Sequence, residues 1–151
     1  MKRAPVENLA IREARWPEDE SLLRQIRTEV FVREQEVPED LEWDGLDATS
    51  RHLLALVGRE PVGTGRLADT GKIGRMAVLS TYRGLGIGER LLAELIRLAV
   101  ESGRHHVYLH AQVHAAGFYA RQGFRAEGED FMEAGIAHRR MTLGLAPEAK
   151  K

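Results

Sequence analysis

Alternating glycines in the middle of the chain constrain its fold more than any other feature. Gly84, Gly86 and Gly88 follow an apolar stretch at 72–79 that fits a β-strand. They precede a stretch with leucines at helical spacing. Glycine tolerates positive φ and lets other groups approach the backbone closely. The sequence therefore predicts a strand, a tight glycine loop and a helix over 89–101.

This loop has two interpretations. A helix N-terminus offers unpaired N–H groups and a positive dipole end, which together favour phosphate. Arg83 adds a charged fork of donors. A purely structural turn would need the same glycines. No Gly-Lys-Ser/Thr tripeptide follows them, and their spacing is not the GxGxxG of a dinucleotide-binding fold, so neither common phosphate motif is present.

Length and composition narrow the class of protein. The 151 residues suggest one domain over 1–151, and a net charge of -1 gives no reason to expect nucleic acid or membrane as a partner. The chain has no cysteine, which excludes disulfides, thiolate metal ligands and a cysteine nucleophile. Residues 1–10 lack an apolar run and carry Glu7, so we expect no secretory signal and a cytoplasmic location.

Periodicity along the rest of the chain predicts alternating strands and helices. The expected order is β-α-β-β-β-α-β-α-β-β, an α/β class. Besides the strand and helix above, it comprises a strand at 9–14, a helix at 19–32, a loop at 33–50, strands at 52–57 and 62–68 joined by a turn at 58–61, a strand at 107–111, a short helix at 115–122 and paired strands at 124–127 and 137–145. Residues 146–151 are expected to form a frayed tail.

Two motifs resemble those of the GNAT N-acetyltransferase superfamily. Arg83-Gly84-Leu85-Gly86-Ile87-Gly88 resembles its Arg/Gln-x-x-Gly-x-Gly/Ala signature, and residues 118–124, Phe-Tyr-Ala-Arg-Gln-Gly-Phe, resemble its Tyr-x-x-x-Gly-Phe segment. The element order is also similar, over nearly the whole chain. Residues 30–35, 44–47, 52–53, 111–112 and 135–138 further resemble the ElaA-like branch.

The resemblance implies a fold and a cosubstrate. The fold is a mixed, mostly antiparallel sheet flanked by helices and splayed at the strand that binds coenzyme A. The cosubstrate is acetyl-CoA, with its pantetheine arm on one strand end and its pyrophosphate on the glycine loop. The residues implied to bind it are Met76, Ala77, Val78, Arg83, Gly84, Leu85, Gly86, Ile87, Gly88, Glu89, Gln112, Phe118 and Tyr119. Gln112 stands where many members carry Asn.

Catalytic roles also follow from the resemblance. Tyr119 matches the tyrosine that protonates the departing thiolate, a role that a phenol can fill at neutral pH. The alternative is a core aromatic packing with Phe118 and Phe124. Gly74 and Arg75 stand where many members carry a basic carboxylate.

The base that accepts the amine proton must then come from elsewhere. Glu34 and His110 are the favoured candidates, followed by His138 and His52, because a neutral histidine is a suitable base near pH 7. Each histidine could equally be a surface or cross-strand residue. No metal site is expected.

The acceptor is expected to be a primary amine of a small molecule or peptide. Residues 34–47 carry seven acidic side chains, which form either a solvated loop or a rim that attracts a cationic amine. Two other functions stay open: a coenzyme A-binding module without chemistry, and a dinucleotide binder. Family members are often dimers, so a homodimer is an analogy only.

Overall fold

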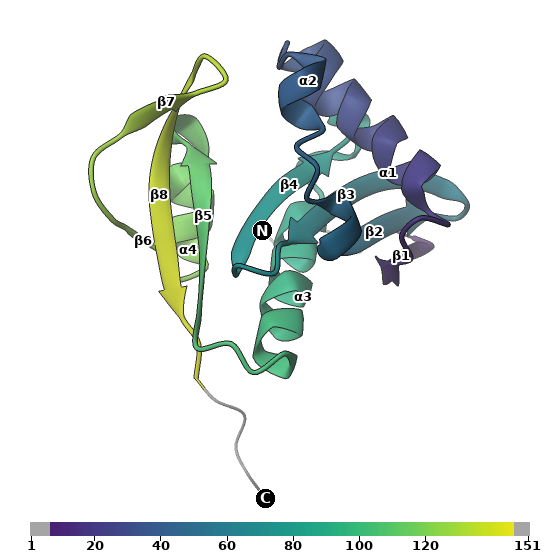
Figure 1. Cartoon of the computed structure of the whole chain (residues 1–151). Coiled ribbons are helices and arrows are strands. Elements are labelled where there is room, and N and C mark those ends of the chain that lie inside the picture. The colour runs from purple at the N-terminus through teal and green to yellow at the C-terminus, as the bar shows by residue number, and fades with distance from the viewer. Residues whose placement is uncertain (1–6, 147–151) are drawn as a thin grey trace, which may run out of the picture.

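The structure, a computed structural model, describes residues 7–146 (Figure 1). Eight strands and four α-helices alternate along it. The strands are β1 (Leu9–Ala14), β2 (Arg51–Val57), β3 (Glu60–Leu67), β4 (Lys72–Val78), β5 (His106–Gln112), β6 (Arg125–Ala126), β7 (Phe131–Glu133) and β8 (Ile136–Gly144). The helices are α1 (Glu20–Arg27), α2 (Glu39–Glu42), α3 (Ile87–Glu101) and α4 (Ala116–Arg121), and a π-helical segment, η1 (Thr28–Glu34), continues α1.

All of the strands belong to one mixed sheet. Its order is β1-β2-β3-β4-β5-β8-β6, and β7 pairs with the N-terminal end of β8. Neighbouring strands are antiparallel except β4 and β5, which are parallel. The expected α/β class with a mostly antiparallel sheet is therefore confirmed.

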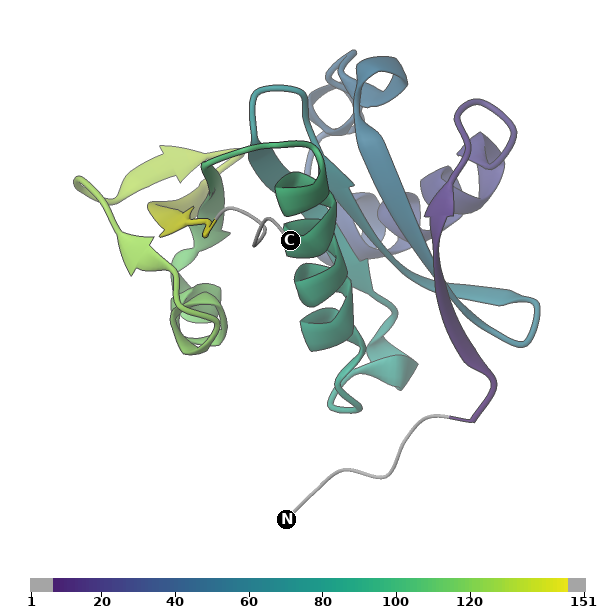
Figure 2. The same ribbon diagram turned by 90° about the horizontal axis from the view of Figure 1, so that it is seen from below.

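Apolar side chains cover both faces of the sheet. Along β2, Leu53 and Ala55 belong to one core with the buried face of α3, while Leu54 belongs to a second core with Leu23 and Ile26 of α1. Because successive strand residues point to opposite faces, an unbroken apolar strand requires a helix on each side. Figure 2 shows α3 crossing one face of the sheet and α1 behind the other.

Three expectations about the elements need correction. The segment 33–50 is not a continuous loop, because it contains α2 and a short 3-10 helix, Asp47–Thr49. The turn expected at 58–61 is shorter, since Glu60 and Pro61 already belong to β3. Strand β7 was not predicted. The tail expected at 146–151 lies, Ala146 apart, outside the described residues.

Helix α3 begins two residues earlier than expected, at Ile87. Gly86 precedes it with a φ of 86°, and Ile87 is buried as the first helical residue. No helix within residues 7–146 is long and apolar enough to cross a membrane.

Candidate active site

The centre of the sheet is opened by the separation of β4 from β5. Within the described chain these strands pair only through Lys72 with Tyr108 and Ile73 with Leu109. Beyond that point β4 carries a bulge, where Arg75 has a φ of 50° and the register with β3 shifts. A bulge bends its strand and increases the local twist, so β4 diverges from β5. The expected splay is therefore present.

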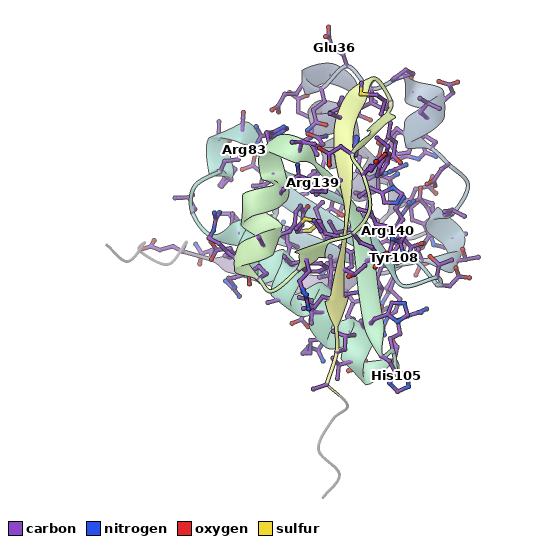
Figure 3. All side chains as sticks on the ribbon, turned by 90° about the vertical axis from the view of Figure 1, so that its left-hand side faces the viewer. Glu36, Arg83, His105, Tyr108, Arg139 and Arg140 are labelled. Carbon is purple, nitrogen blue, oxygen red and sulfur yellow. The ribbon has the colours of Figure 1, made fainter. Side chains whose placement is uncertain are left out.

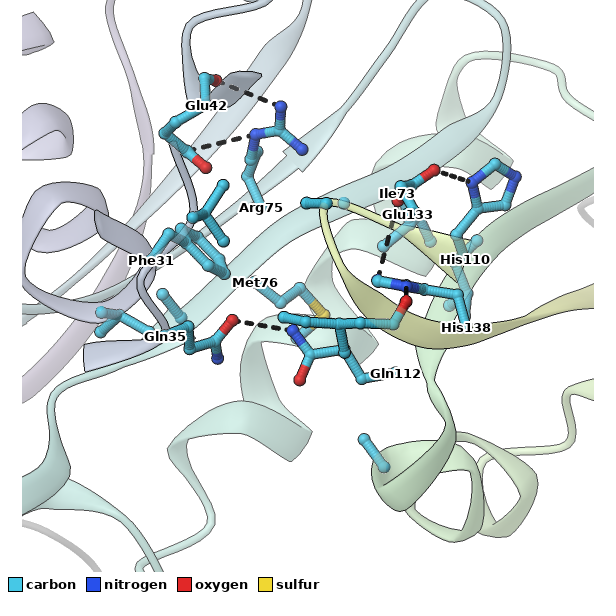
Figure 4. A pocket seen from close by; sticks show the side chains of 18 of the residues that line it. Phe31, Gln35, Glu42, Ile73, Arg75, Met76, His110, Gln112, Glu133 and His138 are labelled. Carbon is cyan, nitrogen blue, oxygen red and sulfur yellow. Dashed lines mark hydrogen bonds and ion pairs between the residues drawn. The ribbon is translucent and has the colours of Figure 1, made fainter. Parts of the chain in front are cut away.

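A cavity of about 640 Å³ fills this opening. Its walls come from η1, α2, β4, β5, α4 and the β7–β8 hairpin, and it includes the end of β4 at Met76, Ala77 and Val78. Arg83, Gln112 and Tyr119 also line it. The fold thus brings residues from most of the chain to one place (Figure 4).

The glycine loop forms the predicted turn into α3. Gly84 and Gly86 have φ values of 77° and 86°, a region that favours glycine. The backbone N–H groups of Ile87 and Gly88 lie in the first helical turn, where no intrahelical acceptor is available. A Cβ on Gly88 would lie 3.6 Å from Cζ of Phe118, so α4 packs beside the loop. Leu85 is exposed in the loop, and Glu89 follows in the helix.

Arg83 makes a double ion pair with Glu34. Its two terminal nitrogens donate to the Glu34 carboxylate over 2.6 and 2.8 Å, and its Nε donates to the carbonyl of Val78 over 2.9 Å. The hydrogen bond from Arg83 lowers the pKa of Glu34. Both oxygens of Glu34 are occupied by this pair, which lies beside the glycine loop.

Tyr119 packs among aromatic side chains and also lines the cavity. Its ring makes edge contacts with Phe118 and Phe124, with centroids 5.0 and 6.0 Å apart. Its hydroxyl points to the sulfur of Met76 on β4, 3.9 Å away. Burial raises the pKa of Tyr119 to about 12, so the phenol keeps its proton at neutral pH.

Gln112 spans the opening between the strands. Its Nε2 donates to Oε1 of Gln35, at the end of η1, over 2.7 Å (Figure 4). Gln35 lies in the ElaA-like segment 30–35 but was not among the predicted site residues. Its contact with Gln112 leaves no local signal, because it joins residues 77 positions apart in the sequence.

The histidine candidates separate into two groups. His110 and His138 line the cavity, whereas His52 is outside it, stacked on Trp16 and bonded to the carbonyl of Asp47. His52 is thus buried away from the cavity.

The cavity histidines share a partner on β7 that sequence reasoning missed. Oε1 of Glu133 lies 3.0 Å from Nδ1 of His110, and Oε2 lies 3.7 Å from Nε2 of His138. Ala134 and Gly135 have φ values of 52° and 75°, the conformation of a two-residue hairpin turn. Gly135 is the one residue of this turn whose type favours that conformation, so the sequence signal for β7 was weak. In residues 7–146 no group of three or more acidic or histidine side chains is placed to hold a metal ion.

The acidic segment is largely neutralised by arginines from other elements. Arg27 pairs with Glu42 and Asp47, Arg66 with Asp44 and Asp47, and Arg75 with Glu42 and Asp44. Glu34 is paired with Arg83, as described. Four of the seven acids at 34–47 are therefore held in ion pairs and do not form a free acidic rim. Glu36 points away from the molecule (Figure 3).

This fold is that of an acyltransferase. Residues 15–145 match the family model described as an acetyltransferase (GNAT) domain. The chain is 39% identical over 120 residues to "Uncharacterized N-acetyltransferase YjcF" of Bacillus subtilis (strain 168), covering 77% of this chain and 86% of that protein. It is 34% identical over 138 residues to "Protein ElaA" of Escherichia coli (strain K12), covering 83% and 85%.

Solved structures agree with these relatives. Escherichia coli ElaA superposes with a TM-score of 0.81 at 29% identity, over 88% of this chain and 98% of that one. An acyl-CoA N-acyltransferase from Pseudomonas aeruginosa gives a TM-score of 0.80 at 33% identity, over 89% and 98%. The chain belongs to the GNAT acetyltransferase family, and within it to the ElaA-like branch.

Proposed function

We propose that the protein transfers an acetyl group from acetyl-CoA directly to a primary amine of a small molecule or peptide. The observation that carries this proposal is the opening of β4 from β5 after two residue pairs, with Tyr119 and Arg83, which precedes the glycine loop, on the same cavity. An extended thioester cosubstrate needs such a slot. Without a cysteine, the chain has no thiol to hold the acetyl group, which favours direct transfer.

The residues suit the parts of acetyl-CoA in turn. The backbone of Met76, Ala77 and Val78 would hydrogen-bond the pantetheine arm, because this strand edge has no partner strand on the β5 side among the described residues. Amides of the glycine loop and first turn of α3 would bind the pyrophosphate. Arg83 would join them once it leaves Glu34.

Tyr119 is the proposed proton donor. The acceptor nitrogen bonds to the acetyl carbon, the carbon–sulfur bond breaks, and the phenol supplies a proton to the sulfur. The phenol of Tyr119 keeps its proton at neutral pH, so the proton is available to the departing sulfur. We place the base at the His110 side of the cavity, since Glu34 lies beside Arg83 and the glycine loop, where the pyrophosphate would bind.

Thiol release tests the proposal. Purified protein is mixed with acetyl-CoA and primary amines, and free coenzyme A is followed over time. Amine-dependent release is the expected result. Calorimetric binding of acetyl-CoA without release for any amine would instead favour a binding module, and binding of NAD but not acetyl-CoA would favour the dinucleotide alternative.

A further inference from the structure

One carboxylate lies between two histidine rings on the wall of the cavity. Glu133 comes from β7, His110 from β5 and His138 from β8. Figure 4 shows this group across the cavity from Phe31 and Gln35. Glu133 therefore faces the space that an acceptor would share with the acetyl group.

Hydrogen-bond chemistry places a proton on Nδ1 of each ring. The carbonyl of Ile136 can only accept, and it lies 2.7 Å from Nδ1 of His138, so that nitrogen carries a hydrogen. An ionised carboxylate can also only accept, so Nδ1 of His110 donates to Glu133 over 3.0 Å. Both histidines thus have a defined orientation toward their partner.

The ring of His110 is itself held in place. Phe131 meets it edge-on at a centroid distance of 4.9 Å, and Tyr108 lies 6.2 Å away on the same strand. Arg140 in turn lies over the ring of Tyr108, 4.1 Å from its centroid (Figure 3). A fixed ring holds its hydrogen-bond partner in one geometry.

The charge of Glu133 is retained at neutral pH. Burial opposes its ionisation, but the hydrogen bond from His110 and the nearby charge of Lys72 act against it, and the pKa of Glu133 is lowered. Burial also lowers the pKa of His110, which favours its neutral form. The Glu133 carboxylate can then attract a cationic amine.

We propose that Glu133 binds the ammonium group of the acceptor amine and takes its proton, and that His110 positions the Glu133 carboxylate. This inference rests on the proposed acetyl transfer. One N–H proton passes to a Glu133 oxygen, and the electron pair of that bond becomes the lone pair that bonds to the acetyl carbon. The Glu133 side chain is 44% exposed, so the carboxyl can then return the proton to water.

The direct test compares two charge-neutralising substitutions. Glu133→Gln keeps the shape of the side chain but removes its charge, and Glu129→Gln does the same at an exposed position in the preceding loop. Both are assayed for thiol release with acetyl-CoA and spermidine, a lysine peptide with a blocked α-amino group, and phenethylamine. We expect kcat/KM for the best amine to fall about 10²-fold or more in Glu133→Gln alone. Calorimetric affinity for acetyl-CoA should be unchanged in both.

The positioning role of His110 has its own readout. His110→Ala should lower kcat/KM for the amine. It should also move the acid limb of the pH profile of kcat/KM to higher pH, because Glu133 loses the hydrogen bond that favours its ionised form and its pKa rises. Lys72 and His138 remain around the carboxylate in this variant. His110→Gln, whose amide can still donate to Glu133, should recover part of the activity and of the pH profile.

The outcomes separate this inference from the proposed function. Thiol release by the parent protein with equal kcat/KM in Glu133→Gln and Glu129→Gln would overturn the role of Glu133 and leave acetyl transfer standing. An acid limb that stays in place in His110→Ala would overturn the positioning role. Absence of release by the parent protein with every amine would overturn both the function and the inference that rests on it.

Discussion

Replacing Arg27 by Met should destabilise the protein strongly. The guanidinium is 1% exposed and donates to Oε2 of Glu42 and Oδ1 of Asp47, each over 2.7 Å, and to the carbonyl of Glu42 over 3.0 Å. Glu42 is itself 2% exposed, so the substitution leaves a buried carboxylate with less compensation. Removing one partner of a buried ion pair costs about 3–5 kcal/mol. In a chain of this size that corresponds to a fall in Tm of about 6–20 °C.

Urea unfolding followed by circular dichroism and by tryptophan fluorescence measures the change, provided that the two transitions coincide. Arg33→Met is the matched control, because the Arg33 side chain is 73% exposed and pairs with the exposed Glu29. That control should change the free energy of unfolding by less than about 1 kcal/mol. If Arg27→Met lowered the free energy of unfolding no more than Arg33→Met does, the buried ion pairs of Arg27 would not stabilise the fold as argued.

Three further predictions concern the site. Gly86→Val should abolish acetyl-CoA binding in calorimetry, whereas Gly103→Val, at a similar positive φ beyond the other end of α3, should carry the same backbone strain and keep binding. Tyr119→Phe should reduce turnover about 10²-fold or more in the thiol-release assay with unchanged acetyl-CoA affinity; full turnover across the pH range would remove Tyr119 from the mechanism. Glu34→Gln should free Arg83 to bind the pyrophosphate and so tighten acetyl-CoA binding about two- to fivefold, the range for an exposed ion pair. Weaker binding would contradict a competition between Glu34 and the pyrophosphate for Arg83.

The local features of this protein could be predicted from its sequence. Periodicity located the long elements, such as α3, because a helix or strand face recurs at a fixed spacing along the chain. The glycine loop could be placed because Gly84 and Gly86 adopt φ values that other residues rarely take. The family motifs then pointed to Arg83 and Tyr119, and both lie on the cavity.

The partners of those residues were decided by the tertiary structure. Seven acids at 34–47 looked like a charged surface, but Arg27, Arg66 and Arg75 reach three of them from α1, β3 and β4. Strand β7 has only three residues, too few for a periodic signal, and yet it supplies Glu133. A sequence shows which groups can ionise or donate. Which of them meet depends on how distant segments cross the sheet, because charge pairing and burial act through space and leave no spacing along the chain.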